Sequence, residues 1–154
     1  MNTNVIQLEA EILLKESFFG LLILGLVAIF NIYSFAKISL TYRRSLRKST
    51  FRGEPYEMLR FVGFIMLLVI AILVSLSIWV LALSFFGFVS DWLMALLFVA
   101  GFFTTVGNVS MDIPLAWRLI PSIIAFSGLF SFAWATASSI SMARDLSNYL
   151  EKHK

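Results

Sequence analysis

The residues of this chain that suggest chemistry form one short run between two long hydrophobic segments: Thr104, Thr105, Val106, Gly107 and Asn108. Thr105 offers both a backbone carbonyl and a hydroxyl oxygen, and oxygen ligands of this kind suit hard monovalent cations. Gly107 permits the positive φ that a loop needs when it turns alternate carbonyl groups toward one axis. The residues Thr105, Val106 and Gly107 can therefore offer loop oxygens to a cation. The alternative is an ordinary turn between helices.

The composition places these residues in a membrane protein. Of the 154 residues, 60% are hydrophobic and 14% are charged. Soluble domains carry roughly 45–50% apolar and about 25% charged residues. The chain has no cysteine, and its single histidine lies in the polar C-terminal tail. We therefore expect no disulfide, no cysteine-based metal site and no thiol catalysis.

Three segments are apolar over a length that crosses the hydrocarbon core of a bilayer, about 30 Å thick. They are residues 18–40, 61–87 and 114–143. Asn31, within the first span, is expected to make an interhelical hydrogen bond. The apolar stretch that begins at Trp92 is shorter, and segments of its length are more often re-entrant or buried than spanning. Asp91 precedes it as a predicted N-cap, so the sequence predicts a short helix over 91–104.

The remaining segments are more polar. Residues 1–17 have apolar side chains at helical spacing, which predicts a short amphipathic helix that lies on the membrane. Residues 41–60 form a linker in which Gly53 and Pro55 interrupt any helix. The tail, residues 144–154, is polar and mixed in charge.

Positive charge is concentrated in the linker, which contains six of the twelve cations: Arg43, Arg44, Arg47, Lys48, Arg52 and Arg60. By the positive-inside rule this linker is cytoplasmic. Three spans and a re-entrant loop then place the C-terminus in the cytoplasm and the N-terminus outside, in a multi-pass protein of the cell membrane. The first five of these cations are also predicted to contact anionic lipid headgroups, and no nucleic-acid partner is expected.

A chain with four full spans is the alternative topology. It would place the basic tail opposite the basic linker, which the positive-inside rule disfavours. Such a chain would be a non-conducting membrane scaffold or accessory subunit.

The run Ala-Leu-Leu-Phe-Val-Ala-Gly-Phe-Phe-Thr-Thr-Val-Gly, which ends at Gly107, resembles the pore helix and the start of the selectivity filter in tetrameric potassium-type channels. Downstream, Pro114-Leu115-Ala116 followed by Arg118 resembles the residues that open the inner helix of that family. Gly128 lies near the usual position of its hinge glycine. The resemblance implies an all-α homotetrameric pore, with a pore domain over 61–143. Its parts would be an outer helix 61–87, a pore helix 91–104, a filter 104–110 and an inner helix 114–143. The resemblance also implies passive conduction rather than an enzyme, with no cofactor other than permeant K⁺ or Na⁺.

Three residues depart from the filter of that family: Asn108, Val109 and Ser110 replace its tyrosine, second glycine and aspartate. Valine is β-branched and poorly suited to a left-handed backbone, so the outer carbonyl rings are not expected in their usual geometry. Shortened filters resemble the nonselective members of the family, so we expect a cation channel with weak selectivity between Na⁺ and K⁺. A potassium-selective channel with an unusual outer filter is the alternative within this class.

Two further sets of residues flank the predicted filter. Ser110 and Asp112 are expected at the outer mouth, where carboxylates would concentrate cations; a salt bridge from Asp112 to Arg118, or simple solvation, is the alternative. Along the last span, small residues lie on or beside one helical face: Ser127, Gly128, Ser131, Ala135 and Ser138. This face suits an aqueous inner cavity or close helix packing, and Gly128 suits a bend or a packing contact.

Overall fold

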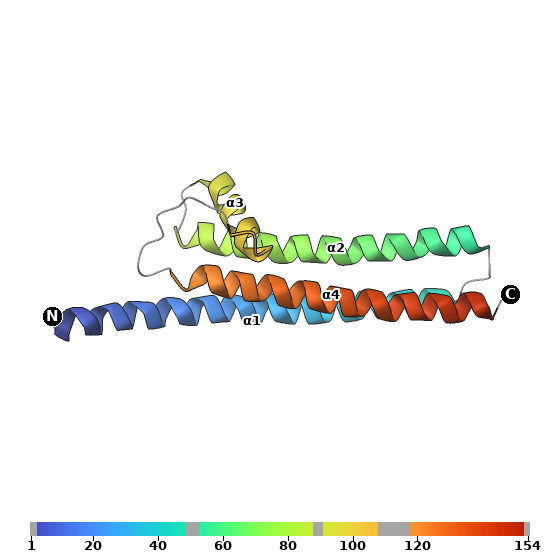
Figure 1. Cartoon of the computed structure of the whole chain (residues 1–154), viewed down its shortest axis with the longest axis horizontal. Helices are drawn as coiled ribbons and strands as arrows, with labels where there is room; N and C mark the ends of the chain where they lie inside the picture. Colours follow the sequence, from blue (N-terminus) through green and yellow to red (C-terminus); the bar gives the residue numbers. More distant parts are fainter. Residues whose placement is uncertain (1–2, 49–52, 88–90, 108–117, 153–154) are drawn as a thin grey trace. The chain divides into compact units, whose positions relative to one another are not determined.

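The computed structural model describes residues 3–48, 53–87, 91–107 and 118–152 of the chain (Figure 1). These residues form four α-helices in the order α1 (Thr3–Lys48), α2 (Glu54–Phe85), α3 (Trp92–Phe103) and α4 (Ile120–Glu151). The described part of the chain is therefore all-helical, as the sequence predicts.

Three of the helices are long and apolar enough to cross a membrane: Ser17–Lys48 within α1, all of α2 and all of α4. Each of these segments has 32 residues, which is about 48 Å of helix and more than a hydrocarbon core of about 30 Å. The 12 residues of α3 span only about 18 Å. The predicted membrane protein with three spanning segments is thus supported, and α3 is the short apolar helix that the sequence predicts between the last two.

The polar segments of the chain differ most from their prediction. Residues 3–17 are helical but continue without a break into the first span, so the described backbone has no separate surface helix. The predicted linker 41–60 is helical up to Lys48 and again from Glu54. Arg and Lys are good helix formers, so a run of cations does not end a helix. Gly53, at φ +106°, immediately precedes α2. Pro55 does not interrupt the helix, because it lies in the first turn of α2.

The last helix is also displaced from its predicted bounds. The expected inner helix, 114–143, has its first residues outside the described part of the chain, and α4 begins at Ile120. It continues to Glu151 through most of the expected tail, 144–154. Polar residues in the tail are compatible with a helix, because the part of a helix that extends out of the bilayer does not need apolar side chains on every side.

The helices divide into two compact units, and α1, α2 and α4 each contribute to both. The first unit comprises Met1–Ala28 and Ser75–Phe130. Its buried apolar side chains come from all four helices: Ile23, Val27, Trp79, Val80, Leu83, Ala95, Phe98, Val99, Phe103, Ile120 and Ile124. At Gly20, a Cβ atom would lie 2.7 Å from Ile123 Cδ1 and 2.8 Å from Ile120 Cδ1. Glycine therefore permits a close approach of α1 to α4 within this unit.

The second unit comprises Ile29–Val74 and Ser131–Lys154. Its core is a cluster of buried side chains from α1, α2 and α4: Phe35, Tyr42, Leu46, Leu68, Ala71, Ala135, Met142 and Leu146. The amide of Asn31 donates a buried hydrogen bond of 2.7 Å to Ser131 Oγ. The predicted interhelical hydrogen bond of Asn31 is thereby confirmed, and it joins α1 to α4.

A buried ion pair lies at the start of α2 in the same unit. Glu57 is fully buried and pairs with Arg60 one turn later, whose side chain is 13% exposed. The aromatic ring of Tyr42 is also fully buried and lies 5.2 Å from the ring of Phe64, centroid to centroid. Charges inside an apolar bundle are tolerated only as pairs, so Glu57 and Arg60 depend on one another.

Candidate cation site

The candidate site begins with the helix that leads into it. Asp91 has an extended backbone (φ −100°, ψ 118°), and its carboxylate accepts a hydrogen bond of 3.0 Å from the backbone N–H of Leu93. Asp91 is therefore the N-cap of α3, as predicted. One face of the helix is buried, through Ala95, Phe98, Val99 and Phe103. The cap fixes where α3 begins, and this buried face fixes how it lies in the first unit.

The far end of α3 lies directly against α4. A Cβ atom at Gly128 would lie 1.8 Å from the carbonyl oxygen of Phe103 and 2.8 Å from its carbonyl carbon. Both neighbours are backbone atoms, so no side-chain rotation can make room for a larger residue. Gly128 is thus a packing contact, and α4 is one continuous helix through this position. The last residue of α3 is held by the backbone of the neighbouring helix.

A hydrogen bond from α2 also reaches the part of α4 that holds the end of α3. The indole Nε1 of Trp79 donates to Ser127 Oγ at 3.0 Å, and both side chains are buried. Ser127 and Gly128 are adjacent on α4, so the contacts from α2 and α3 reach the same turn of that helix. This turn fixes the end of α3 and the residues that follow it.

Thr104 terminates α3. Its backbone N–H donates to the carbonyl of Ala100 at 3.0 Å. Its hydroxyl donates to the same carbonyl at 2.7 Å, and a longer contact of 3.4 Å reaches Gly101. The hydroxyl of Thr104 therefore adds a second hydrogen bond to the carbonyl of Ala100, which already accepts from the backbone N–H of Thr104.

Thr105 and Gly107 have unusual backbone conformations. Thr105 has φ of +62° and Gly107 has φ of +73°, whereas Val106 between them is not among the residues with positive φ. The positive φ expected at Gly107 is confirmed, and the one at Thr105 was not expected. A β-branched residue rarely adopts this region, so the conformation of Thr105 is strained.

Hydrogen bonds hold this loop close to α3. The backbone N–H of Thr105 donates to Phe102 O at 3.0 Å, and that of Gly107 donates to Gly101 O at 2.9 Å. The Thr105 hydroxyl donates to Thr104 O at 2.6 Å. Because the hydroxyl is the donor in this bond, its oxygen lone pairs remain capable of accepting or of coordinating a cation.

The described part of the chain does not enclose the loop. Residues 104–107 are all exposed, and Val106 is 74% exposed. The three residues predicted as cation ligands, Thr105, Val106 and Gly107, lie together after the end of α3. Among the described residues, no group of three or more His, Asp or Glu side chains could hold a metal ion.

The small residues predicted along the last span are buried by helix contacts within the described chain. Ser127 bonds to Trp79 in the first unit, and Ser131 accepts from Asn31 in the second. Ala135 and Ser138 are also buried in the second unit. These contacts agree with close helix packing, one of the two interpretations of this face.

Several predicted residues lie outside the described part of the chain: Arg52, Asn108, Val109, Ser110, Asp112 and Pro114. Arg118 is described and exposed. Trp79 and Phe103 both position the loop, and neither was predicted from the sequence. An apolar span carries no local signal that separates a buried aromatic residue from one that faces lipid.

The fold and the site define a class of protein, an all-helical chain with three candidate membrane-spanning helices and a strained loop after a short apolar helix. No particular family follows from comparison: no family model, no curated protein and no solved structure matches this chain.

Proposed function

We propose that this protein is a cation channel in which copies of the loop after α3 surround the ion pathway. The observation that carries the proposal is the alternation of backbone conformation, with positive φ at Thr105 and Gly107 and not at Val106. In an extended strand, successive residues point to opposite sides. Positive φ at every second residue instead turns successive carbonyls toward one side, as a row of cation ligands requires.

The strain at Thr105 supports a functional role for the loop. Residues held in sparsely populated backbone regions cluster at functional sites, where the surrounding structure over-determines them. Here the surroundings are a capped helix, the Gly128 contact and the two hydrogen bonds that return to α3. The sequence retains threonine at a position where glycine would adopt the same φ at less cost.

The direction of α3 supports a cation as the ligand. The loop follows the C-terminal end of this helix, which carries a partial negative charge of about half an elementary charge. A cation is stabilised there and an anion is not. Thr105 adds carbonyl and hydroxyl oxygens at the same end.

The exposure of the loop supports assembly. Irregular backbone at membrane depth is tolerated only where it is buried in protein or lines a water-filled path. Since one chain leaves residues 104–107 exposed, other copies would supply the enclosure. By the resemblance to potassium-type channels we propose a homotetramer that conducts monovalent cations with weak selectivity between Na⁺ and K⁺.

A second candidate rests on the hydrogen bonds of the same loop. Thr104 Oγ1 to Ala100 O and Gly107 N to Gly101 O are bonds that close a helix C-terminus. They favour a non-conducting membrane scaffold or accessory subunit in which the loop is only a cap.

Ion flux into liposomes that contain the purified protein distinguishes the cation channel from the non-conducting scaffold. Gly107→Ala is the test variant, because a Cβ there meets nothing within 4 Å and only the positive φ of +73° is disturbed. Gly87→Ala is the matched control, since Gly87 lies in the same unit with φ of +69° and equally open surroundings.

We expect wild-type protein and Gly87→Ala to pass K⁺ and Na⁺ at similar rates and Gly107→Ala to pass much less of either. Flux of K⁺ with exclusion of Na⁺ would replace weak selectivity by the potassium-selective alternative. No flux from wild-type protein would favour the scaffold. Flux that Gly107→Ala leaves unchanged would show that ions do not pass along this loop, and the proposed filter would be wrong.

A further inference from the structure

A charged cavity lies in the second unit, between the last turns of α1 and α4. Its volume is about 470 Å³, and its lining combines cationic, polar and aromatic side chains: Arg43, Leu46, Arg47, Asp145, Asn148, Tyr149 and Lys152. Three of these residues are cations and one is an anion, so the lining carries a formal charge of +2. A cavity of this charge is suited to an anionic group.

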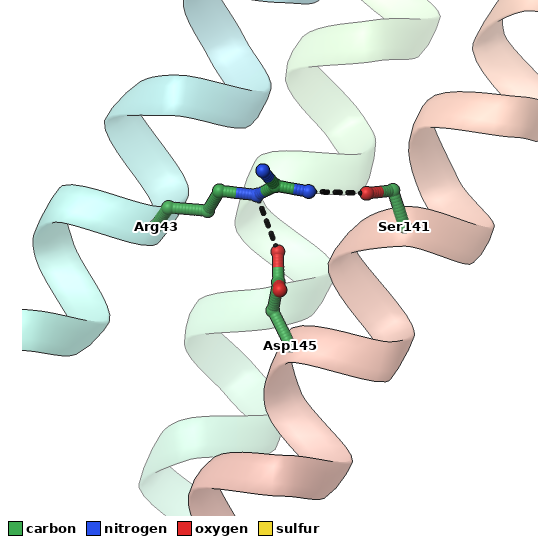
Figure 2. A network of polar contacts seen from close by, with 3 residues as sticks. All are labelled: Arg43, Ser141 and Asp145. Carbon is green, nitrogen blue, oxygen red and sulfur yellow. Dashed lines mark hydrogen bonds and ion pairs between the residues drawn. The ribbon is translucent and has the colours of Figure 1, made fainter.

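Arg43 is held in a fixed position at this cavity. Its Nε donates to Asp145 Oδ2 at 2.6 Å, and its Nη2 donates to Ser141 Oγ at 2.6 Å. Figure 2 shows the guanidinium reaching from α1 to both residues on α4, with its remaining nitrogen turned away from them. An arginine that is already ordered loses less conformational freedom when it binds an anion.

The cations do more than stabilise the ends of their helices. Lys and Arg in the last turn of a helix interact favourably with its dipole. Arg47 and Lys48 lie in the last turn of α1. Arg43 lies more than one turn earlier, however, and Lys152 follows the end of a different helix. Cations from two helices therefore share one cavity, which the dipole effect does not require.

We propose that this cavity binds the phosphate group of an anionic phospholipid. Guanidinium groups match the geometry of phosphate oxygens. The cavity lies at the ends of two helices that are apolar enough to span a membrane. Basic residues at this depth attract the anionic lipids of the cytoplasmic leaflet. The bilayer is therefore the source of phosphate nearest to the cavity. This site is independent of ion conduction, and it involves α1, which lies outside the resemblance to channels.

Asp145 lowers the positive charge of the cavity and thereby its affinity for anionic lipid. Its side chain is 28% exposed and neutralises one of the three cations. Asp145→Asn would raise the charge of the lining from +2 to +3 while keeping an oxygen that accepts from Arg43. The variant is therefore expected to bind anionic lipid more tightly than the wild type.

The experiment measures binding of phosphatidylglycerol to the purified protein in detergent, by native mass spectrometry. Phosphatidylcholine, inorganic phosphate and glycerol 3-phosphate are the comparison ligands. The test variant is Arg47→Gln/Lys152→Gln, which removes two lining cations and neither partner of the Arg43–Asp145 ion pair. The control variant is Arg44→Gln/Lys48→Gln, which removes two cations that do not line the cavity. A melting curve verifies that each variant is folded.

We expect the test variant to lose roughly tenfold in affinity for phosphatidylglycerol, the control to lose little, and Asp145→Asn to gain several-fold. Equal losses from test and control would show that only the general positive charge attracts lipid, and the proposal would be wrong. Equal binding of inorganic phosphate and phosphatidylglycerol would assign the site to free phosphate instead. Unchanged binding in the test variant would also overturn the proposal.

Discussion

The backbone of Gly128 in α4 and the carbonyl of Phe103 at the end of α3 are in such close contact that a Cβ on Gly128 would lie 1.8 Å from the Phe103 oxygen. The residue that ends α3 is thereby fixed by a neighbouring helix, and the strained loop begins directly after it. The position of the candidate site thus depends on a residue that is distant in the sequence.

Gly128→Ala should therefore separate α3 from α4. Overpacking of a well-packed interior costs about 1–3 kcal/mol, and a contact with backbone atoms belongs at the upper end of that range. We expect a clearly lower melting temperature in detergent and loss of ion flux. Gly25→Ala in the same unit is the control, because a Cβ there meets nothing within 4 Å. A Gly128→Ala protein as stable as the control would contradict this contact.

The hydrogen bond from Trp79 to Ser127 should show measurable coupling. Ser127→Ala leaves the indole N–H buried without its acceptor, which costs about 1–3 kcal/mol. A double-mutant cycle with Trp79→Phe separates the bond from the packing that each change also alters. We expect a coupling of about 1 kcal/mol in chemical unfolding. Ser122→Ala, an exposed serine on the same helix, is the control, and additive losses would show that the bond contributes nothing.

The ion pair of Glu57 and Arg60 gives a third prediction. Glu57→Gln leaves Arg60 charged with its side chain only 13% exposed, and loss of one partner of a buried pair costs about 3–5 kcal/mol. The double variant Glu57→Gln/Arg60→Gln should recover much of this loss, because no isolated charge remains. Glu54→Gln, an exposed acid one turn earlier, should change the unfolding free energy by less than about 0.5 kcal/mol. Recovery that is absent from the double variant would argue against the pair.

Local signals in the sequence predict part of this structure well. The bounds of α3 agree within one residue with the predicted 91–104, because Asp91 supplies a cap and the run after Phe103 supplies an end. Length and hydropathy locate the three long helices, because a bilayer sets a minimum length for an apolar span. The prediction that Gly53 and Pro55 interrupt any helix in the linker is wrong for Pro55, which lies in the first turn of α2.

Contacts between distant residues account for what the sequence leaves open. The same pattern of small residues on α4 suits a cavity or a packed face, and only the positions of Trp79 and Asn31 decide what touches Ser127 and Ser131. Residue type predicts positive φ at Gly107 but not at Thr105, since threonine alone disfavours it. That conformation is imposed by the loop's hydrogen bonds to α3.

The proposed topology can be tested with single cysteines, because the natural chain has none. An α3 of about 18 Å is too short to cross the bilayer, so both of its flanks should lie on the same side. Trp92→Cys and Arg118→Cys should react with an impermeant maleimide on intact cells, and Lys48→Cys and Glu151→Cys only after permeabilisation. Labelling of Trp92→Cys and Arg118→Cys from opposite sides would establish four spans and end the channel proposal.

Thr105 gives the prediction that separates backbone strain from ion coordination. Thr105→Gly removes the penalty of a β-branched residue at φ +62° and should stabilise the fold by roughly 0.5–1 kcal/mol, after the entropy cost of glycine. It also removes the hydroxyl that the proposal assigns to the cation. We therefore expect a higher melting temperature together with reduced flux.

Thr105→Ser is the matched variant, because it keeps the hydroxyl and loses only the methyl group. It should retain most of the wild-type flux, while Thr105→Val, which keeps the shape and loses the hydroxyl, should conduct poorly. If the loop were only a structural cap, Thr105→Gly would still be more stable than the wild type, but ion flux would not depend on the hydroxyl. Flux from Thr105→Val equal to that from Thr105→Ser would remove the hydroxyl from the ligand set and leave only the backbone carbonyls.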